Sequence, residues 1–298
     1  LSDRLVSIEI VDEDGENADC ATIVIDNRDD LVELPAMDAT LEIALGYRET
    51  GLTMMGRFTV DGRGGEGPIQ TLSIRATAAD MKGSIRSPRT RAWENRTLSD
   101  IVRTIAGEAG LDAVVGGSIA ATRWPYLAQT AESNLHFLRR IALPLNATAK
   151  PAGGALVVAR RGEDQTAAGD AMPNGRITRA DLAAWSWSEE GRERSGKVTA
   201  EWSDVDTAQR ERVEAGEGEP ELRLRHVFSS MDEANRAVEG NVRRRRDGEV
   251  TLTCELNRFA PELVGGARLT LLGVSSKVDG QWQISRVAHT LSTSLLTS

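Results

Sequence analysis

The 298-residue sequence has little cysteine, few aromatic residues and no long apolar run. Its two cysteines, Cys20 and Cys254, are too few for a disulfide scaffold and lack the paired spacing of a zinc site, so we expect a reducing compartment. No apolar stretch approaches the roughly 18 to 20 residues that span a bilayer, which predicts no membrane insertion. The first residues lack the basic and apolar segments of a signal peptide.

Basic residues are also fewer than acidic ones: the chain has 36 Lys and Arg against 45 Asp and Glu, which gives a formal net charge of −9. Such a chain has no general affinity for polyphosphates. The run Arg243, Arg244, Arg245 and Arg246 is the exception. It follows apolar positions at helical spacing, and cations at a helix C-terminus complement the helix dipole. With six Trp, two Tyr and four Phe, nucleic-acid recognition is the minor interpretation.

Histidine is scarce, and His136, His226 and His289 lie far apart in the sequence. On a helical wheel the stretch after residue 134 has one apolar face, formed by Leu135, Leu138, Ile141, Ala142 and Leu145. His136 projects opposite the centre of that face, beside Arg139 and Arg140. No second ligand or orienting acid is close in sequence, so we expect a solvent- or partner-facing side chain and not a metal ligand or catalytic base.

Other candidate motifs fail on their context. "GRGGEG" (62–67) matches a dinucleotide fingerprint, but Pro68 and a β-branched run follow it where a helix should start, so a glycine-rich hairpin loop is expected. "VDEDGE" (11–16) lacks the glycine and terminal glutamate of a calcium loop and predicts a solvated turn. Carboxylate pairs abound, yet none is singled out. We therefore predict no catalytic, cofactor-binding or metal-binding residues, and no cofactor.

The chain divides by its patterning. Residues 1–90 contain short β-branched runs bounded by Gly or Pro, typical of a sandwich or barrel. Residues 91–162 predict an α+β domain: a helix between Thr97 and Gly110, a second helix over about 132–143 that stops at Pro144, and a hairpin around residues 153 and 154.

Residues 163–176 have linker composition, and residues 177–298 return to β patterning with one helix near 231–246. The two β regions share an order of strand, proline, small residues, strand ending in Gly, turn, and Gly-led strand with an aromatic. Gly46 corresponds to Gly273 and Phe58 to Trp282 at nearly the same offset. We predict a mainly β fold in which two similar antiparallel β-barrel domains flank a small helix–hairpin domain. The alternative is the general likeness of antiparallel hairpins.

Several segments together resemble the late control D proteins of phages. "AESNLHFLRRIA" followed by "GGALVVARRG" is similar to the helix and hairpin of that family, and "LPAMDATLEIALGY", "TLSDIVRTIAGEAGL" and "GQWQISRVAHTLSTSLLTS" are similar to its other segments. Their order over nearly the whole chain is more specific than any one of them. These are baseplate hub proteins of contractile tails, related to the N-terminal part of the valine–glycine repeat spike proteins of type VI secretion.

The resemblance implies a structural role: a homotrimeric adaptor of two β-barrel tube domains per chain that joins the tail tube to the central spike. Implied partners are a spike protein, a tail tube or tube-initiator protein and baseplate wedge proteins, with DNA only as passing cargo. The implied location is the virion tail baseplate, assembled in the bacterial cytoplasm. The helix break at Pro144 departs from the family, and no needle-like β-helix is present, so a separate spike protein is expected.

Under this interpretation His136, Arg139, Arg140 and Arg243 to Arg246 are interface candidates. Two other classes stay open. A cell-wall hydrolase would need a convergent acid pair with one strongly raised pKa. A carbohydrate-binding module would need exposed, coplanar tryptophans in the helix–hairpin domain. Phage, headless tailocin and secretion apparatus are not distinguished.

Overall fold

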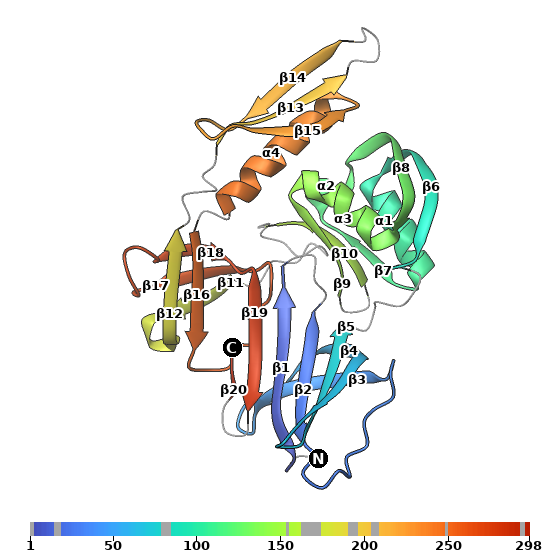
Figure 1. The fold of residues 1–298 in the computed structure, drawn as a ribbon. Coiled ribbons are helices and arrows are strands. Elements are labelled where there is room, and N and C mark those ends of the chain that lie inside the picture. The colour runs from blue at the N-terminus through green and yellow to red at the C-terminus, as the bar shows by residue number, and fades with distance from the viewer. Residues whose placement is uncertain are drawn as a thin grey trace.

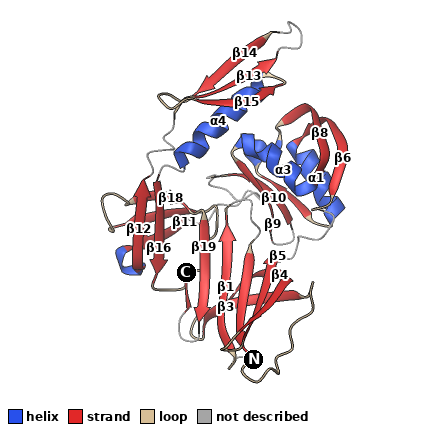
Figure 2. Ribbon diagram, in the orientation of Figure 1, coloured by secondary structure: helices blue, strands red, loops and turns tan. Residues whose placement is uncertain are grey.

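Strands dominate the structure, a computed structural model that describes residues 3–14, 19–78, 85–152, 155–161, 174–189, 196–203, 209–247, 250–292 and 296–298 (Figures 1 and 2). Within these described residues, four hydrophobic clusters of buried side chains mark four packed units. We call them the first sheet, the helix–hairpin unit (85–161), the C-terminal β unit (174–189 with 250–287) and the appended unit (196–247).

The first sheet has seven antiparallel strands in the order β20-β19-β1-β2-β5-β4-β3. Their bounds are β1 Leu5–Glu13, β2 Cys20–Asp26, β3 Thr40–Tyr47, β4 Gly51–Glu66, β5 Thr71–Ala78, β19 Arg286–Ser292 and β20 Leu296–Thr297. Alternating β-branched residues such as Ile10, Val60 and Ile74 fill the buried face. β19 pairs along β1, with Ser7 opposite Ser292. This part of the predicted 177–298 domain therefore completes the first sheet.

The helix–hairpin unit packs its helices on two small sheets, β6–β8 and β7–β10–β9. Its elements are β6 Pro88–Thr97, α1 Leu98–Ala109, β7 Asp112–Val115, α2 Gly117–Ala120, β8 Arg123–Ser133, α3 Asn134–Ala142, η1 Leu143–Leu145, β9 Ala147–Ala152 and β10 Ala155–Arg160. Ile85 belongs to its core, so this unit begins a few residues before the predicted boundary at 91.

The predicted helix ends are confirmed. Thr97 caps α1, because its Oγ1 accepts the amide of Asp100 at 3.1 Å while the Asp100 carboxylate accepts the Thr97 amide at 3.1 Å. Gly110 ends the helix in the left-handed conformation, at φ 70°. α3 ends at Ala142, and a single 3₁₀ turn containing Pro144 follows it.

The C-terminal β unit joins a two-stranded and a three-stranded sheet around one core. Its strands are β11 Asn174–Thr178, β12 Leu182–Glu189, β16 Val250–Leu256, β17 Arg268–Leu272 and β18 Gly280–Gln283, with the turn η2 at Arg179–Asp181. Of the predicted linker 163–176, residues up to 173 lie outside the described residues, and 174–176 belong to β11. β11 pairs with β17 in parallel, a departure from a purely antiparallel barrel.

Both hairpins that were matched in the sequence are present. β3 pairs with β4 and β17 with β18, each antiparallel. Gly46 allows close approach, since a Cβ there would lie 2.0 Å from the Gly51 carbonyl oxygen, and Gly273 has a φ of 69° that favours glycine. The two hairpins are placed differently in their sheets, because β3, the first strand of its hairpin, lies at a sheet edge, whereas β17 lies between β11 and β18.

The appended unit was not expected as a separate body. β13 Val198–Ser203, β14 Arg210–Ala215 and β15 Leu222–Phe228 form one sheet, and α4 Met231–Asp247 covers it with Ala234, Ala237 and Val238. α4 also packs against η1 of the helix–hairpin unit, where Gly240 lies against the Pro144 carbonyl (Figure 1).

Candidate partner interface

The outward face of α3 carries the first group of interface candidates. Ser133 caps the helix by accepting the His136 amide at 3.2 Å, and the opposite face is buried. The side chain of His136 is 71% exposed, as the helical wheel predicts. Arg140 is also exposed, whereas Arg139 is half-buried.

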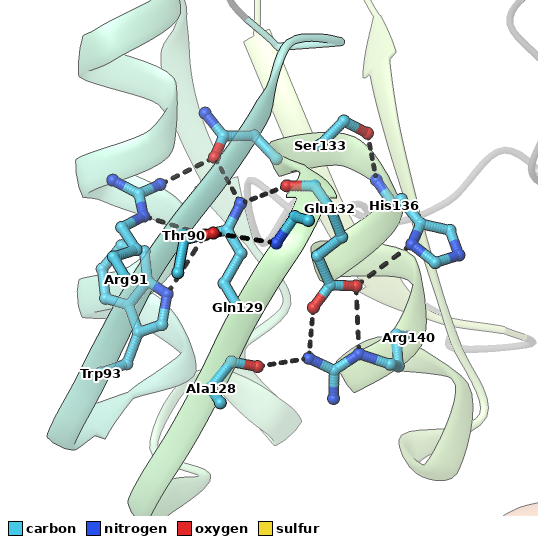
Figure 3. A network of polar contacts seen from close by, with 11 residues as sticks. Thr90, Arg91, Trp93, Ala128, Gln129, Glu132, Ser133, His136 and Arg140 are labelled. Atoms are coloured by element: carbon cyan, nitrogen blue, oxygen red, sulfur yellow. Dashed lines mark hydrogen bonds and ion pairs between the residues drawn. The ribbon is translucent and has the colours of Figure 1, made fainter.

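Glu132 gathers two of these side chains into one cluster (Figure 3). Its Oε2 lies 3.1 Å from Nδ1 of His136, and its two oxygens accept hydrogen bonds from Nη2 and Nε of Arg140 at 2.5 and 3.2 Å. Glu132 is four residues before His136, so the expectation that no orienting acid lies close in sequence is wrong. Nη2 of Arg140 also donates to the Ala128 carbonyl at 2.7 Å. The cluster ties α3 to β8, and a bidentate pair with a mostly buried Glu132 is geometrically fixed.

A shallow pocket of about 730 Å³ opens beside this cluster. It is lined by Arg86, Pro88, Ala128, Thr130, Ala131, Glu132, Ser133, His136 and Arg140. Glu132 neutralises Arg140, whereas the exposed Arg86 adds a further positive charge to the pocket lining.

A mostly buried polar network lies beside this cluster (Figure 3) and was not anticipated. Arg91 on β6 donates to Gln129 at 2.8 Å, to Asn134 at 2.7 Å and to Glu108 at 2.6 Å, while stacking 4.2 Å from the centre of the Trp93 ring. Gln129 and Asn134 are fully buried. Burial opposes ionisation of Glu108, but the hydrogen bond and charge of Arg91 outweigh it and lower the pKa of that carboxyl.

The second group of candidates lies near the end of α4. Arg243 is exposed and 3.9 Å from Glu239 on its own helix, and Arg244 donates to Asn241 at 2.9 Å. Arg245 is half-buried, and the side chain of Arg246 lies outside the described residues. The two groups therefore sit on different helices, which meet indirectly because α4 packs against η1, the turn that continues α3.

Two sequence interpretations need correction. The glycines of "GRGGEG" lie mostly inside β4, which runs to Glu66, and the turn follows at 67–70. The acidic segment 11–16 is more than a solvated turn, because Asp12 and Asp14 are half-buried and hydrogen-bonded to other units. Residues 15–18 lie outside the described residues.

Two features of the described residues bear on the enzyme and carbohydrate-binding alternatives. Trp93 and Trp124 of the helix–hairpin unit are buried, with Trp93 stacked on Phe137 at 5.9 Å between ring centres. The pKa of Asp19 is raised to about 6, first by burial and then by Asp12, but Lys150 binds both carboxylates.

Across the residues that the structure describes, no group of three or more His, Cys, Asp or Glu is placed to hold a metal ion. Burial raises the pKa of both thiols, Cys20 and Cys254, which are half-buried and unbonded. No helix among the described residues combines the length and apolar character of a transmembrane span.

Comparison with solved structures shows the fold. The 43 kDa tail protein of prophage MuSo2 from Shewanella oneidensis superposes with a TM-score of 0.72 at 12% identity, covering 98% of this chain and 92% of that one. A tail protein from Neisseria meningitidis MC58 gives 0.73 at 14%, covering 99% and 90%. The E. coli c3393 protein, a component of the type VI secretion system, gives 0.57 at 12%, covering 99% and 71%.

Sequence comparison shows the family. A probable baseplate hub protein of Escherichia phage 186 is 30% identical over 342 aligned positions, covering all of this chain and 87% of that protein. Its counterpart in Escherichia phage P2 is 34% identical over 202 positions, covering 68% of this chain and 52% of that protein. The family model of the phage tail baseplate hub (GPD) matches residues 22–295. The chain belongs to this phage tail baseplate hub family, and it is a structural protein of the baseplate.

Proposed function

We propose that this baseplate hub protein acts as a homotrimer that joins the tail tube to a separate central spike protein. The observation that carries the proposal is the pair of β units in one chain, each of which contains an antiparallel hairpin, β3–β4 and β17–β18. If the two units are equivalent tube domains, three chains present six similar domains, which suits a sixfold tube on one side and a threefold spike on the other.

Two strand edges support assembly between copies. β3 is the last strand of the first sheet, and β12 is one edge of its two-stranded sheet. Most of β12 is exposed and uncharged, including Ala183, Ser186 and Trp187, whereas a protected edge usually carries charge or proline. An edge of this kind, which no described strand covers, favours pairing with a neighbouring chain.

Further partners in the proposal are a tail tube or tube-initiator protein and baseplate wedge proteins, with assembly in the bacterial cytoplasm. The α3 candidates His136, Arg139 and Arg140 and the α4 candidates Arg243 to Arg246 would face such partners. DNA is cargo that passes through a channel with a neutral or acidic lining, because a basic lining would retain it. Asp12 and Asp14 are unsuited to that lining, since they are engaged within the chain.

The test is molar mass by light scattering at micromolar concentration, alone and with the spike protein from the same gene cluster. We expect a trimer, and Trp187→Asp should weaken assembly by placing charge on the β12 edge. Thr104→Asp on the exposed face of α1 is the matched control. A monomer under both conditions, or equal loss of assembly in both variants, refutes the proposal.

A further inference from the structure

The end of β1 is the place where the helix–hairpin unit meets the first sheet. Lys150 reaches across from β9, and its Nζ donates to Oδ1 of Asp12 at 3.0 Å, to the Glu13 carbonyl at 2.8 Å and to Oδ1 of Asp19 at 3.0 Å. A single ammonium group therefore binds the last residues of β1 and the residue just before β2. Its three donors are fully used, so Lys150 is oriented and not merely nearby.

The same end of β1 also touches the C-terminal β unit. Oδ2 of Asp12 accepts the Gly265 amide at 2.9 Å, and Nε2 of Gln283 donates to Asp14 at 2.6 Å. A Cβ at position 265 would lie 2.6 Å from the Asp14 amide nitrogen, so the two backbones are in close contact. Oδ1 of Asp12 thus binds the helix–hairpin unit and Oδ2 binds the C-terminal β unit. Since Asp12 itself belongs to the first sheet, three units meet at this residue.

The charges at this junction do not balance. Lys150, Asp12 and Asp19 have side chains that are 15%, 22% and 21% exposed, and one cation faces two carboxyl groups. Burial, followed by the nearby Asp12 charge, raises the pKa of Asp19 to about 6. Burial also acts to lower the pKa of Lys150, but the two carboxylates outweigh it and raise that pKa, so the ammonium stays charged.

We propose that Asp12, Asp19 and Lys150 form a proton-sensitive latch that fastens the helix–hairpin unit to the first sheet and the C-terminal β unit. With Asp19 protonated, one ammonium faces one carboxylate and the hydroxyl of Asp19 can donate to Asp12. With Asp19 ionised, a second buried carboxylate has no cation of its own. The latch is therefore tightest on the acid side and loosens as the pH rises through about 6.

Other titratable and charged groups surround the latch. They are Glu13, Asp14, Cys20, Arg161, Arg286 and His289. Burial raises the pKa of Asp14, while the charge of Arg161 opposes that shift. Burial lowers the pKa of His289, so His289 contributes stability at a pH above its ordinary pKa and this contribution is lost as the pH falls. The effect of His289 on stability therefore has the opposite sign to that of Asp19. A variant of Asp19 alone separates the two effects.

Urea unfolding of the full chain at pH 5 and pH 7.5 tests the proton part. The pKa of Asp19 is about 6 in the folded chain and 3.8 in the unfolded chain. The ionisation of Asp19 should therefore raise the equilibrium constant for unfolding about tenfold between pH 5 and pH 7.5. Asp19→Asn mimics the protonated form, so the ratio of unfolding constants should fall about tenfold relative to the parent. An unchanged ratio overturns the proposal.

Small-angle X-ray scattering of the same proteins tests the mechanical part. Lys150→Met keeps the aliphatic stem and removes the charge, and we expect the particle to expand at pH 7.5. Lys197→Met is the matched control, because Lys197 pairs with Glu214 inside the appended unit. Combining Lys150→Met with Asp19→Asn should recover part of the compactness, since one uncompensated charge is removed. Identical profiles for Lys150→Met and the control, with both folded, overturn the latch.

Discussion

Single residues in the helix–hairpin unit explain why its outward face is well defined. Gln129 and Asn134 are fully buried amides whose hydrogen bonds run to Arg91, Glu108 and each other. A buried polar network of this kind stabilises only while all its members are satisfied, because each unpaired group bears its desolvation cost. The network therefore fixes how β8 meets α3, and with it the orientation of the adjacent pocket.

Asn134→Ala removes the hub of this network. It leaves Nη2 of Arg91 and one donor of Gln129 without their shared acceptor, so we expect a loss of about 2–3 kcal/mol in the free energy of unfolding. Chemical denaturation measures it. Gln281→Ala, at an exposed position of β18, should change stability by less than about 0.5 kcal/mol. Equal effects would show that the network is not stabilising.

His289 predicts a pH dependence of the opposite sign to Asp19. Its ring is 2% exposed and accepts from or donates to the Ser298 hydroxyl at 2.7 Å, and burial lowers its pKa below the ordinary value. The neutral ring is favoured in the fold, so its contribution is present above about pH 6.5 and is lost as the pH falls. His289→Gln should flatten that part of the stability curve between pH 7.5 and 5. A parallel curve would contradict the assignment.

At the scale of elements, α4 docks on the helix–hairpin unit through a contact that admits no side chain. A Cβ at Gly240 would lie 2.3 Å from the Pro144 carbonyl oxygen. Gly240→Ala should therefore push α4 from η1 and lower the melting temperature, even though alanine favours helices. Gly107→Ala, at an exposed position in the last turn of α1 with open space around it, should stabilise by about 0.5–1 kcal/mol. Stabilisation by both substitutions would show that the contact is loose.

The elements that the sequence predicts well are those set by local chemistry. The cap at Thr97, the stop at Pro144 and the outward position of His136 follow from residues within a few positions of each other. The polar network could not be predicted from the sequence, because Arg91, Glu108 and Gln129 are brought together only by the fold. Nothing in their spacing distinguishes them from surface residues.

The appended unit was not predicted for a similar reason. The first half of β15 alternates leucine with arginine, as a half-exposed strand does, and this pattern gives no indication of which core the apolar side belongs to. Its core with α4 is separate from that of the C-terminal β unit. Strand pairing over long distances, such as β1 with β19, is likewise invisible to local periodicity.

At the scale of the whole molecule, Tyr47 ties the first sheet to distant segments. Its hydroxyl donates to the Leu296 carbonyl at 3.0 Å and accepts the Phe259 amide at 3.2 Å, and its ring packs edge-on against Phe259. Tyr47→Phe keeps the ring and removes both hydrogen bonds, so we expect a loss of about 1–2 kcal/mol. Hydrogen exchange should rise at residues 259 and 296–298. Unchanged exchange there would refute the link.

The pairing of β1 with β19 also determines when, during synthesis, β1 can gain its second neighbouring strand. Residues 5–13 leave the ribosome long before one of their two strand neighbours, residues 286–292. Until then one edge of β1 stays open, while the helix–hairpin unit between them can fold from local contacts. The nascent chain therefore carries an unpaired strand edge until residues 286–292 are synthesised. Closure of that edge is the step that completes the pairing of β1.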